Sequence, residues 1–105
     1  MTGSQQSISY ELNPAELKKL EGYVQYLEQK GAEVEKSQDY VEAIGTYLKL
    51  VDVLLVFAEG TPSYPQWVKC TTSASSYQKK IKTLIALAKQ KEAEIQLKTE
   101  LPKPT

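Results

Sequence analysis

Residues 39–59 read DYVEAIGTYLKLVDVLLVFAE, and this apolar stretch decides the fold. Its apolar residues recur at steps of three and four, the spacing of a helix face that packs on a neighbour. That seam consists of Tyr40, Ile44, Tyr47, Val51, Leu54 and Ala58. More apolar side chains lie on its flanks, namely Leu48, Leu50, Val53, Leu55, Val56 and Phe57. Since one neighbour would leave these flanks in water, the stretch predicts a helix between two others, or one that borders a groove for a ligand.

The region before this stretch predicts a first helix over about residues 14–36. Asn13 is a capping residue, Pro14 suits the first helical position, and Glu16 stands where it completes a capping box. An apolar seam follows at steps of three and four: Leu17, Leu20, Val24, Leu27, Gly31 and Val34. Residues 1–12 are interpreted as a flexible polar lead.

Two further boundaries complete a three-helix pattern. Asp39 and Glu42 repeat the capping arrangement, and Gly60 provides a helix stop, so the second helix is expected over residues 39–59. A third helix is expected over about residues 65–98, although Pro65 and the Thr/Ser-rich residues 71–76 weaken the signal for its start. Its seam is Trp67, Cys70, Ala74, Tyr77, Ile81, Leu84 and Ala88. Residues 99–105 have the composition of a linker-like tail.

The chain has 105 residues, which suits one small domain. No repeat with a period of 20 to 50 residues is present, so a solenoid is not indicated. The predicted fold is therefore all-α: an antiparallel three-helix bundle with a long third helix. Aromatic residues on seam positions are predicted to be core, whereas for Tyr23 and Tyr26 core and interface are both open. The seam aromatics are Tyr40, Tyr47, Trp67 and Tyr77.

The composition argues against most catalytic chemistry. The chain has no histidine, a single cysteine (Cys70) and five isolated glycines, so the usual general base, zinc site and phosphate loop are missing. We therefore expect no enzyme activity, no cofactor and no metal. The longest apolar run has only six residues, at positions 53–58, so no membrane insertion is expected. One cysteine and no signal-peptide pattern favour the cytoplasm.

Charge is uneven along a chain whose net charge is zero. Residues 65–98 carry seven lysines against two glutamates, whereas residues 39–59 carry one lysine against four acidic residues. Two interpretations stay open: the third helix complements the acidic second helix through weak exposed pairs, or its lysines attract an acidic segment of a partner. No arginine is present to read a base, so no specific nucleic-acid binding is expected.

The order of these motifs resembles the MIT (microtubule-interacting and trafficking) domain, over about residues 14–90. The motifs are Lys30-Gly31-Ala32, Asp39-Tyr40-Val41-Glu42-Ala43-Ile44 with Tyr47, and Tyr77-Gln78-Lys79-Lys80-Ile81 with Leu84. The resemblance implies a module that binds short linear motifs in the tails of ESCRT filament subunits and recruits an AAA ATPase or another effector. The alternative is a tetratricopeptide-like helical hairpin that packs permanently in a larger assembly.

The resemblance also implies peptide grooves beside the third helix. Lys82 stands where the family tends to carry an acidic residue, which favours an acidic or proline-rich motif as the ligand. The isolated domain is expected to be a monomer. The residues assigned to the second/third-helix groove are Leu50, Leu54, Phe57, Lys80, Lys82, Thr83 and Leu87. Those assigned to the first/third-helix groove are Tyr23, Leu27, Ile85 and Lys89, with Val34 and Ile81 beside them.

Overall fold

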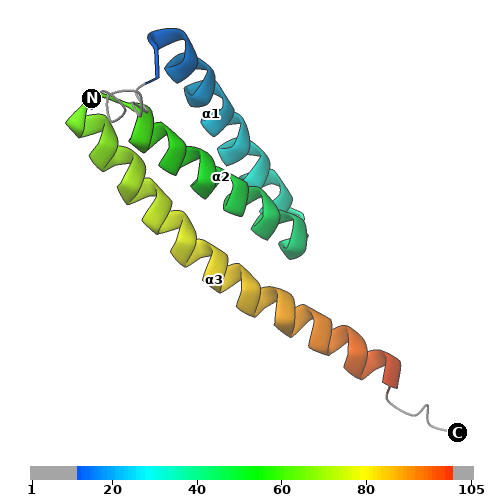
Figure 1. The fold of residues 1–105 in the computed structure, drawn as a ribbon. Helices are drawn as coiled ribbons and strands as arrows, with labels where there is room; N and C mark the ends of the chain where they lie inside the picture. The colour runs from blue at the N-terminus through cyan, green and yellow to red at the C-terminus, as the bar shows by residue number, and fades with distance from the viewer. Residues whose placement is uncertain (1–11, 101–105) are drawn as a thin grey trace, which may run out of the picture.

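The computed structural model describes residues 12–100, and within that range the chain forms three helices (Figure 1). They are α1 (Pro14–Lys36), α2 (Tyr40–Gly60) and α3 (Tyr64–Glu100). The predicted all-α antiparallel bundle with a long third helix is confirmed. Residues 1–11 and 101–105, which make up most of the predicted lead and tail, lie outside the described residues.

The helix boundaries follow from capping side chains that the sequence carries. The Asn13 side chain accepts a hydrogen bond from the Glu16 amide at 2.8 Å, and the Asn13 amide donates to Glu16 Oε1 at 2.9 Å. Asp39 accepts from the Glu42 amide at 3.2 Å. The α1–α2 turn contains Gln38 with a φ of 61°. Each cap satisfies amide groups that have no partner within their own helix, so these residues fix where α1 and α2 begin.

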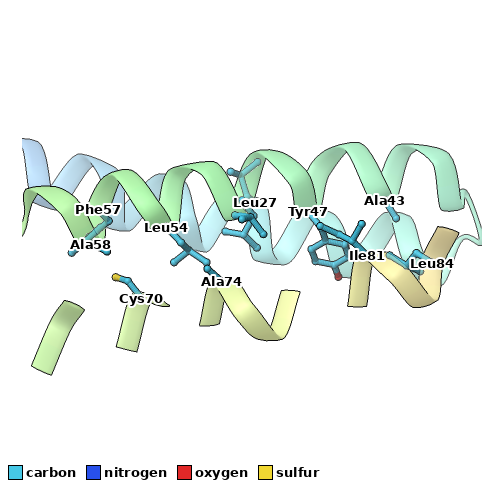
Figure 2. Close-up of a cluster of buried hydrophobic side chains, with 12 residues drawn as sticks. Leu27, Ala43, Tyr47, Leu54, Phe57, Ala58, Cys70, Ala74, Ile81 and Leu84 are labelled. Atoms are coloured by element: carbon cyan, nitrogen blue, oxygen red, sulfur yellow. The ribbon is translucent and has the colours of Figure 1, made fainter. Parts of the chain in front are cut away.

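The middle position of α2 is the main feature of the packing. It lies between α1 and α3 (Figure 1) and contacts both. No Cα atom of α1 comes within 8 Å of a Cα atom of α3. Figure 2 shows the buried cluster, most of which comes from α2. Its members are Leu27, Ala43, Tyr47, Leu50, Val51, Leu54, Phe57, Ala58, Cys70, Ala74, Ile81 and Leu84. The predicted central helix is therefore confirmed.

Trp67 and the pair Tyr23 and Tyr26 lie on the surface of the bundle. Trp67 was predicted to be core, but its side chain is 45% exposed and stacks on Tyr64 with ring centroids 5.9 Å apart. Trp67 lies in the first turn of α3, where it borders a surface hollow with the connecting residues Thr61, Pro62 and Ser63. Tyr23 and Tyr26 stack on each other at 6.3 Å and are both exposed, which favours the surface position for this pair.

The C-terminal part of α3 extends past the other two helices (Figure 1). At about 1.5 Å per residue, α3 is roughly 55 Å long and α2 only about 30 Å. All side chains from residue 89 to residue 99 are exposed. The last anchoring contact is made by Lys91, whose Nζ donates to the Gln38 carbonyl at 2.9 Å and lies 5.7 Å from the centre of the Tyr40 ring.

Candidate functional site: the groove between α1 and α3

A groove runs between α1 and α3 because both helices pack on α2 with their backbones more than 8 Å apart, Cα to Cα. It contains a hollow of about 140 Å³ with Leu54 and Phe57 of α2 at its floor. A second hollow shares Glu21, Phe57 and Gln66 with the first and continues toward the start of α1. The walls of the first hollow are Glu21, Val24, Gln25 and Glu28 on α1, and Gln66, Lys69, Cys70 and Ser73 on α3.

Small side chains on α3 keep this part of the groove open. Cys70, Ser73 and Ala74 lie where the helix faces α2 and α1, and none of them is long enough to reach across. The Thr/Ser-rich residues 71–76 are poor helix formers. Within this stretch Ser73 lines the hollow and Ala74 belongs to the buried cluster, so small side chains at these two positions have a packing reason that helix propensity does not give.

The other end of the groove is closed by polar contacts. The Tyr77 hydroxyl donates to Glu28 Oε2 at 2.9 Å, and Lys80 Nζ donates to Glu35 Oε1 at 3.0 Å. The Tyr47 hydroxyl also donates to Glu35 Oε1, at 3.0 Å, and its ring stacks on Tyr77 at 5.3 Å. These contacts join α1 to α3 across α2, so only the half of the groove near the start of both helices is open.

The two tyrosines are held in their neutral, donating form. Burial and the hydrogen bond to Glu28 raise the pKa of Tyr77 to about 12. Burial and the hydrogen bond to Glu35 raise the pKa of Tyr47 even further. Because a phenolate beside a carboxylate would be repelled, both hydroxyl groups keep their protons and the closed end persists through the neutral pH range.

Cys70 in the α3 wall of the groove is not poised as a nucleophile. Cys70 is only 3% exposed, and burial raises the pKa of its thiol above the ordinary value. A thiol rather than a thiolate therefore predominates at neutral pH, and thiols react slowly. Within residues 12–100, no group of three or more His, Cys, Asp or Glu side chains is arranged to hold a metal ion.

The residues predicted for the second/third-helix groove do not line one groove in the structure. Leu50, Leu54 and Phe57 are all buried, and the last two form the floor of the α1/α3 groove instead. Lys80 faces α1 through Glu35, on the opposite flank of α3 from the predicted one. Leu87 borders a shallow hollow near Gln38 and Tyr40. Lys82 and Thr83 are exposed.

The residues predicted for the first/third-helix groove are also separated. Leu27 is a core residue, 3% exposed, and Tyr23 lines neither hollow of the α1/α3 groove. Ile85 and Lys89 are exposed, and at 100° per residue they lie on the side of α3 away from Lys80. The prediction that α1 and α3 border a groove agrees with the observed hollows, but the residues that line them are different.

Several lining residues were missed by the sequence reasoning, and their spacing carries a usable signal. Glu21, Gln25 and Glu28 follow each other at steps of four and three along α1. Gln66, Lys69 and Ser73 do the same along α3 at steps of three and four. Each row runs beside the apolar seam of its own helix, which is where the rim of an inter-helix groove must lie.

Comparison with family models, curated proteins and solved structures finds no match to this chain. None of the helices in the described part of the chain is long and apolar enough to cross a membrane. Fold and site together define a class, an all-α three-helix bundle with one half-open groove between its outer helices.

Proposed function

We propose that the chain is a non-catalytic peptide-recognition module and that a short segment of a partner protein lies in the α1/α3 groove. The observation that supports this most is the shape of the groove, an apolar floor between two polar walls. The groove holds a hollow of about 420 Å³ toward the start of α1 beside the first hollow, and the first hollow, of about 140 Å³, is itself below the roughly 300–1,000 Å³ typical of small-molecule pockets. A hollow of this size suits one or two anchoring side chains of a peptide that continues along an open groove.

The lining residues suggest how such a peptide is recognised. Leu54 and Phe57 offer an apolar floor for an anchoring side chain, while Gln25, Gln66 and Ser73 offer hydrogen bonds to the peptide main chain. Both charges are present on the walls, with Glu21 and Glu28 on α1 and Lys69 on α3. An apolar or proline-rich segment with an acidic residue toward Lys69 fits this arrangement.

The resemblance to the MIT domain suggests which partner and which effector the module would bring together. The partner would be the tail of an ESCRT-type filament subunit, and the module would recruit an AAA ATPase or another effector to it in the cytoplasm. The three-helix architecture with a long third helix agrees with that reading. The site proposed here is the groove on the α1 side of α3.

A matched pair of variants tests the proposal. Ser73→Arg fills the groove, whereas Ser75→Arg places the same side chain on the exposed surface of α3. A peptide selected from a random phage-displayed library against the parent chain is titrated into each variant by calorimetry. We expect at least about tenfold weaker binding to Ser73→Arg and little change for Ser75→Arg. Equal affinity for both, with both folded by circular dichroism, would refute the groove as the site.

A second candidate function is structural packing within a larger assembly. One observation favours it: Val41, Leu48 and Leu55 on α2 are 75%, 51% and 44% exposed, although they are large and apolar. Contiguous exposed apolar side chains commonly mark an interface. This surface lies outside the α1/α3 groove, so the two functions are separable by experiment.

A further inference from the structure

Glu28 is the carboxylate at the inner end of the open half of the α1/α3 groove. Its side chain lines the hollow of about 140 Å³, and its Oε2 atom accepts the Tyr77 hydroxyl at 2.9 Å. Glu28 is only partly exposed, whereas Glu21, seven residues earlier on the same wall, is exposed. Glu28 is therefore the more enclosed of the two acidic groups on the α1 wall.

This carboxylate has no positively charged partner within residues 12–100. The ion pairs found there do not include it; they are Lys30–Glu42 and Lys80–Glu35. The α1 positions three and four residues away, on the same face of the helix, carry no charge; they are Val24, Gln25, Gly31 and Ala32. Because the pKa of Tyr77 is raised to about 12, its hydroxyl donates to Glu28 as a neutral group and brings no positive charge.

Lys69 lines the same hollow, but it lies nearer the open end of the groove than Glu28 does. Both α1 and α3 run antiparallel to α2, so they run in the same direction, and the hydrogen bond to Glu28 makes Tyr77 level with it. Lys69, eight residues before Tyr77, is then about 12 Å closer to the open end. Glu21 is about 10 Å closer by the same measure. Lys69 is therefore roughly level with Glu21, and the charge of Glu28 is left unmatched.

A partly buried carboxylate in this position is a ready recognition point for a cation. A carboxylate has lone-pair sites for about four hydrogen bonds, and Tyr77 uses one of them. The floor beside it is apolar, since it consists of Leu54 and Phe57. Charges attract more strongly beside apolar protein than in open water, so a cation that reaches Glu28 gains more here than on an exposed helix surface.

We propose that Glu28 selects a lysine or arginine of the bound segment and that Tyr77 is a positioning residue, which holds the carboxylate in place beside the hollow. This inference rests on the proposed function, because it specifies the partner segment of the same groove. The aliphatic part of the basic side chain lies over Leu54 and Phe57, while its charged end reaches the Glu28 carboxylate.

The register of the two walls also gives the spacing of charges in the segment. An acidic residue of the segment lies toward Lys69, about 12 Å from the level of Tyr77 and Glu28. An extended peptide advances about 3.3 Å per residue. The basic residue is therefore expected three or four positions away from the acidic one, on the side of the closed end of the groove.

Two phage-displayed peptide libraries test the proposal, one that encodes all amino acids and one that omits lysine and arginine. Each library is selected against the full chain, and the affinities of the recovered peptides are measured by calorimetry. The best binders from the complete library should carry a lysine or arginine and bind at least about tenfold more tightly than the best binder from the restricted library. Equal affinities from the two libraries would overturn the proposal.

A double-mutant cycle then tests whether Glu28 is the residue that reads the charge. Glu28→Gln removes the charge but keeps an oxygen that can accept the Tyr77 hydroxyl, so the fold should be retained. It should weaken the selected peptide about tenfold, yet have little effect on the same peptide with its basic residue replaced by methionine. Additive effects of the two changes would overturn the role of Glu28. Glu33→Gln, on the exposed surface of α1 outside both hollows, is the matched control and should leave the affinity unchanged.

Tyr77→Phe separates positioning from a purely structural role. It removes the hydroxyl that holds Glu28 and should weaken the selected peptide by a smaller factor than Glu28→Gln does. That effect should vanish for the methionine peptide, whereas a general loosening of the bundle would weaken both peptides equally.

The outcomes distinguish this inference from the function on which it rests. Peptides that bind in the groove, as judged by their sensitivity to Ser73→Arg, but whose affinity is unchanged by Glu28→Gln would leave peptide recognition in place and overturn the role of Glu28. The absence of any binder from either library would overturn both.

Discussion

Gly31 is the residue whose replacement tests the packing of α1 on α2 most sharply. A Cβ atom added there would lie 2.6 Å from Cε1 and 2.7 Å from Cζ of Tyr47. The ring has no room to move, because Tyr47 is 2% exposed, stacks on Tyr77 at 5.3 Å and donates to Glu35 at 3.0 Å. Gly31→Ala therefore forces α1 away from α2 or breaks these contacts.

The expected size follows from two opposing terms. Helix propensity favours alanine over glycine by about 1 kcal/mol. Overpacking a well-filled core costs about 1–3 kcal/mol, occasionally more. We expect the upper end or beyond here because the close atoms belong to a fixed ring, which leaves a net loss of about 2 kcal/mol. At roughly 4–8 °C per kcal/mol for a domain of this size, the Tm should fall by about 10 °C.

Gly22→Ala provides the matched control in the same helix. A Cβ atom added at Gly22 meets no described heavy atom within 4 Å, so only the propensity term acts. That variant should gain about 0.5–1 kcal/mol. Both are measured by thermal and urea unfolding, followed by circular dichroism at 222 nm, the standard wavelength for helix content. Equal stability of Gly31→Ala and Gly22→Ala would contradict the close packing of Gly31 on Tyr47.

Three further predictions concern the core, the closed end of the groove and a cap. Leu54→Ala should lower the free energy of unfolding by about 2–5 kcal/mol, because Leu54 is 4% exposed; an unchanged urea midpoint would contradict its core position. The folded pKa of Tyr77, about 12, exceeds the ordinary value, so its contribution to stability is complete below about pH 10 and is lost as the pH rises through the folded pKa. Tyr77→Phe should flatten this alkaline loss in urea titrations, and an identical pH profile would count against the Glu28 contact. Asn13→Ala should cost about 1 kcal/mol through the lost cap, and no change in Tm would show that α1 starts elsewhere.

Much of the fold was predictable because capping and periodicity are local properties. Asn13 and Asp39 are followed by glutamates three residues later, and both cap their helices as expected. The seam residues of α2 identified it as the central helix, and that prediction is confirmed. Trp67 was misplaced because its spacing agrees with the seam, whereas its side chain borders the loop residues Thr61, Pro62 and Ser63 and is not part of the buried cluster.

The site was predicted less well, for a physical reason. Periodicity gives the angle of a residue around its own helix but not which neighbour lies on which side. Lys80 and Lys82 were assigned to one groove, yet their side chains lie on nearly opposite sides of α3. Cys70 and Ser73 were missed because the groove is open where side chains are short. A hydrophobic pattern records which residues are apolar but not how long they are, so it does not predict such an opening.

The two surfaces of the bundle have distinct chemistry. The α1/α3 groove combines an apolar floor with polar walls and is closed at one end by the tyrosine–glutamate contacts. The second surface is the line of exposed apolar residues Val41, Leu48 and Leu55 on α2. The first suits a short segment, and the second suits packing within a larger assembly.

The most direct test of the central claim is an amide chemical-shift map of the ¹⁵N-labelled chain, titrated with a library-selected peptide. We expect the largest shifts on both walls of the groove, at Val24, Gln25 and Glu28 of α1 and at Gln66, Lys69 and Ser73 of α3. Largest shifts at Leu48, Leu55 and Lys82 instead, with the groove amides unmoved, would contradict peptide recognition between α1 and α3.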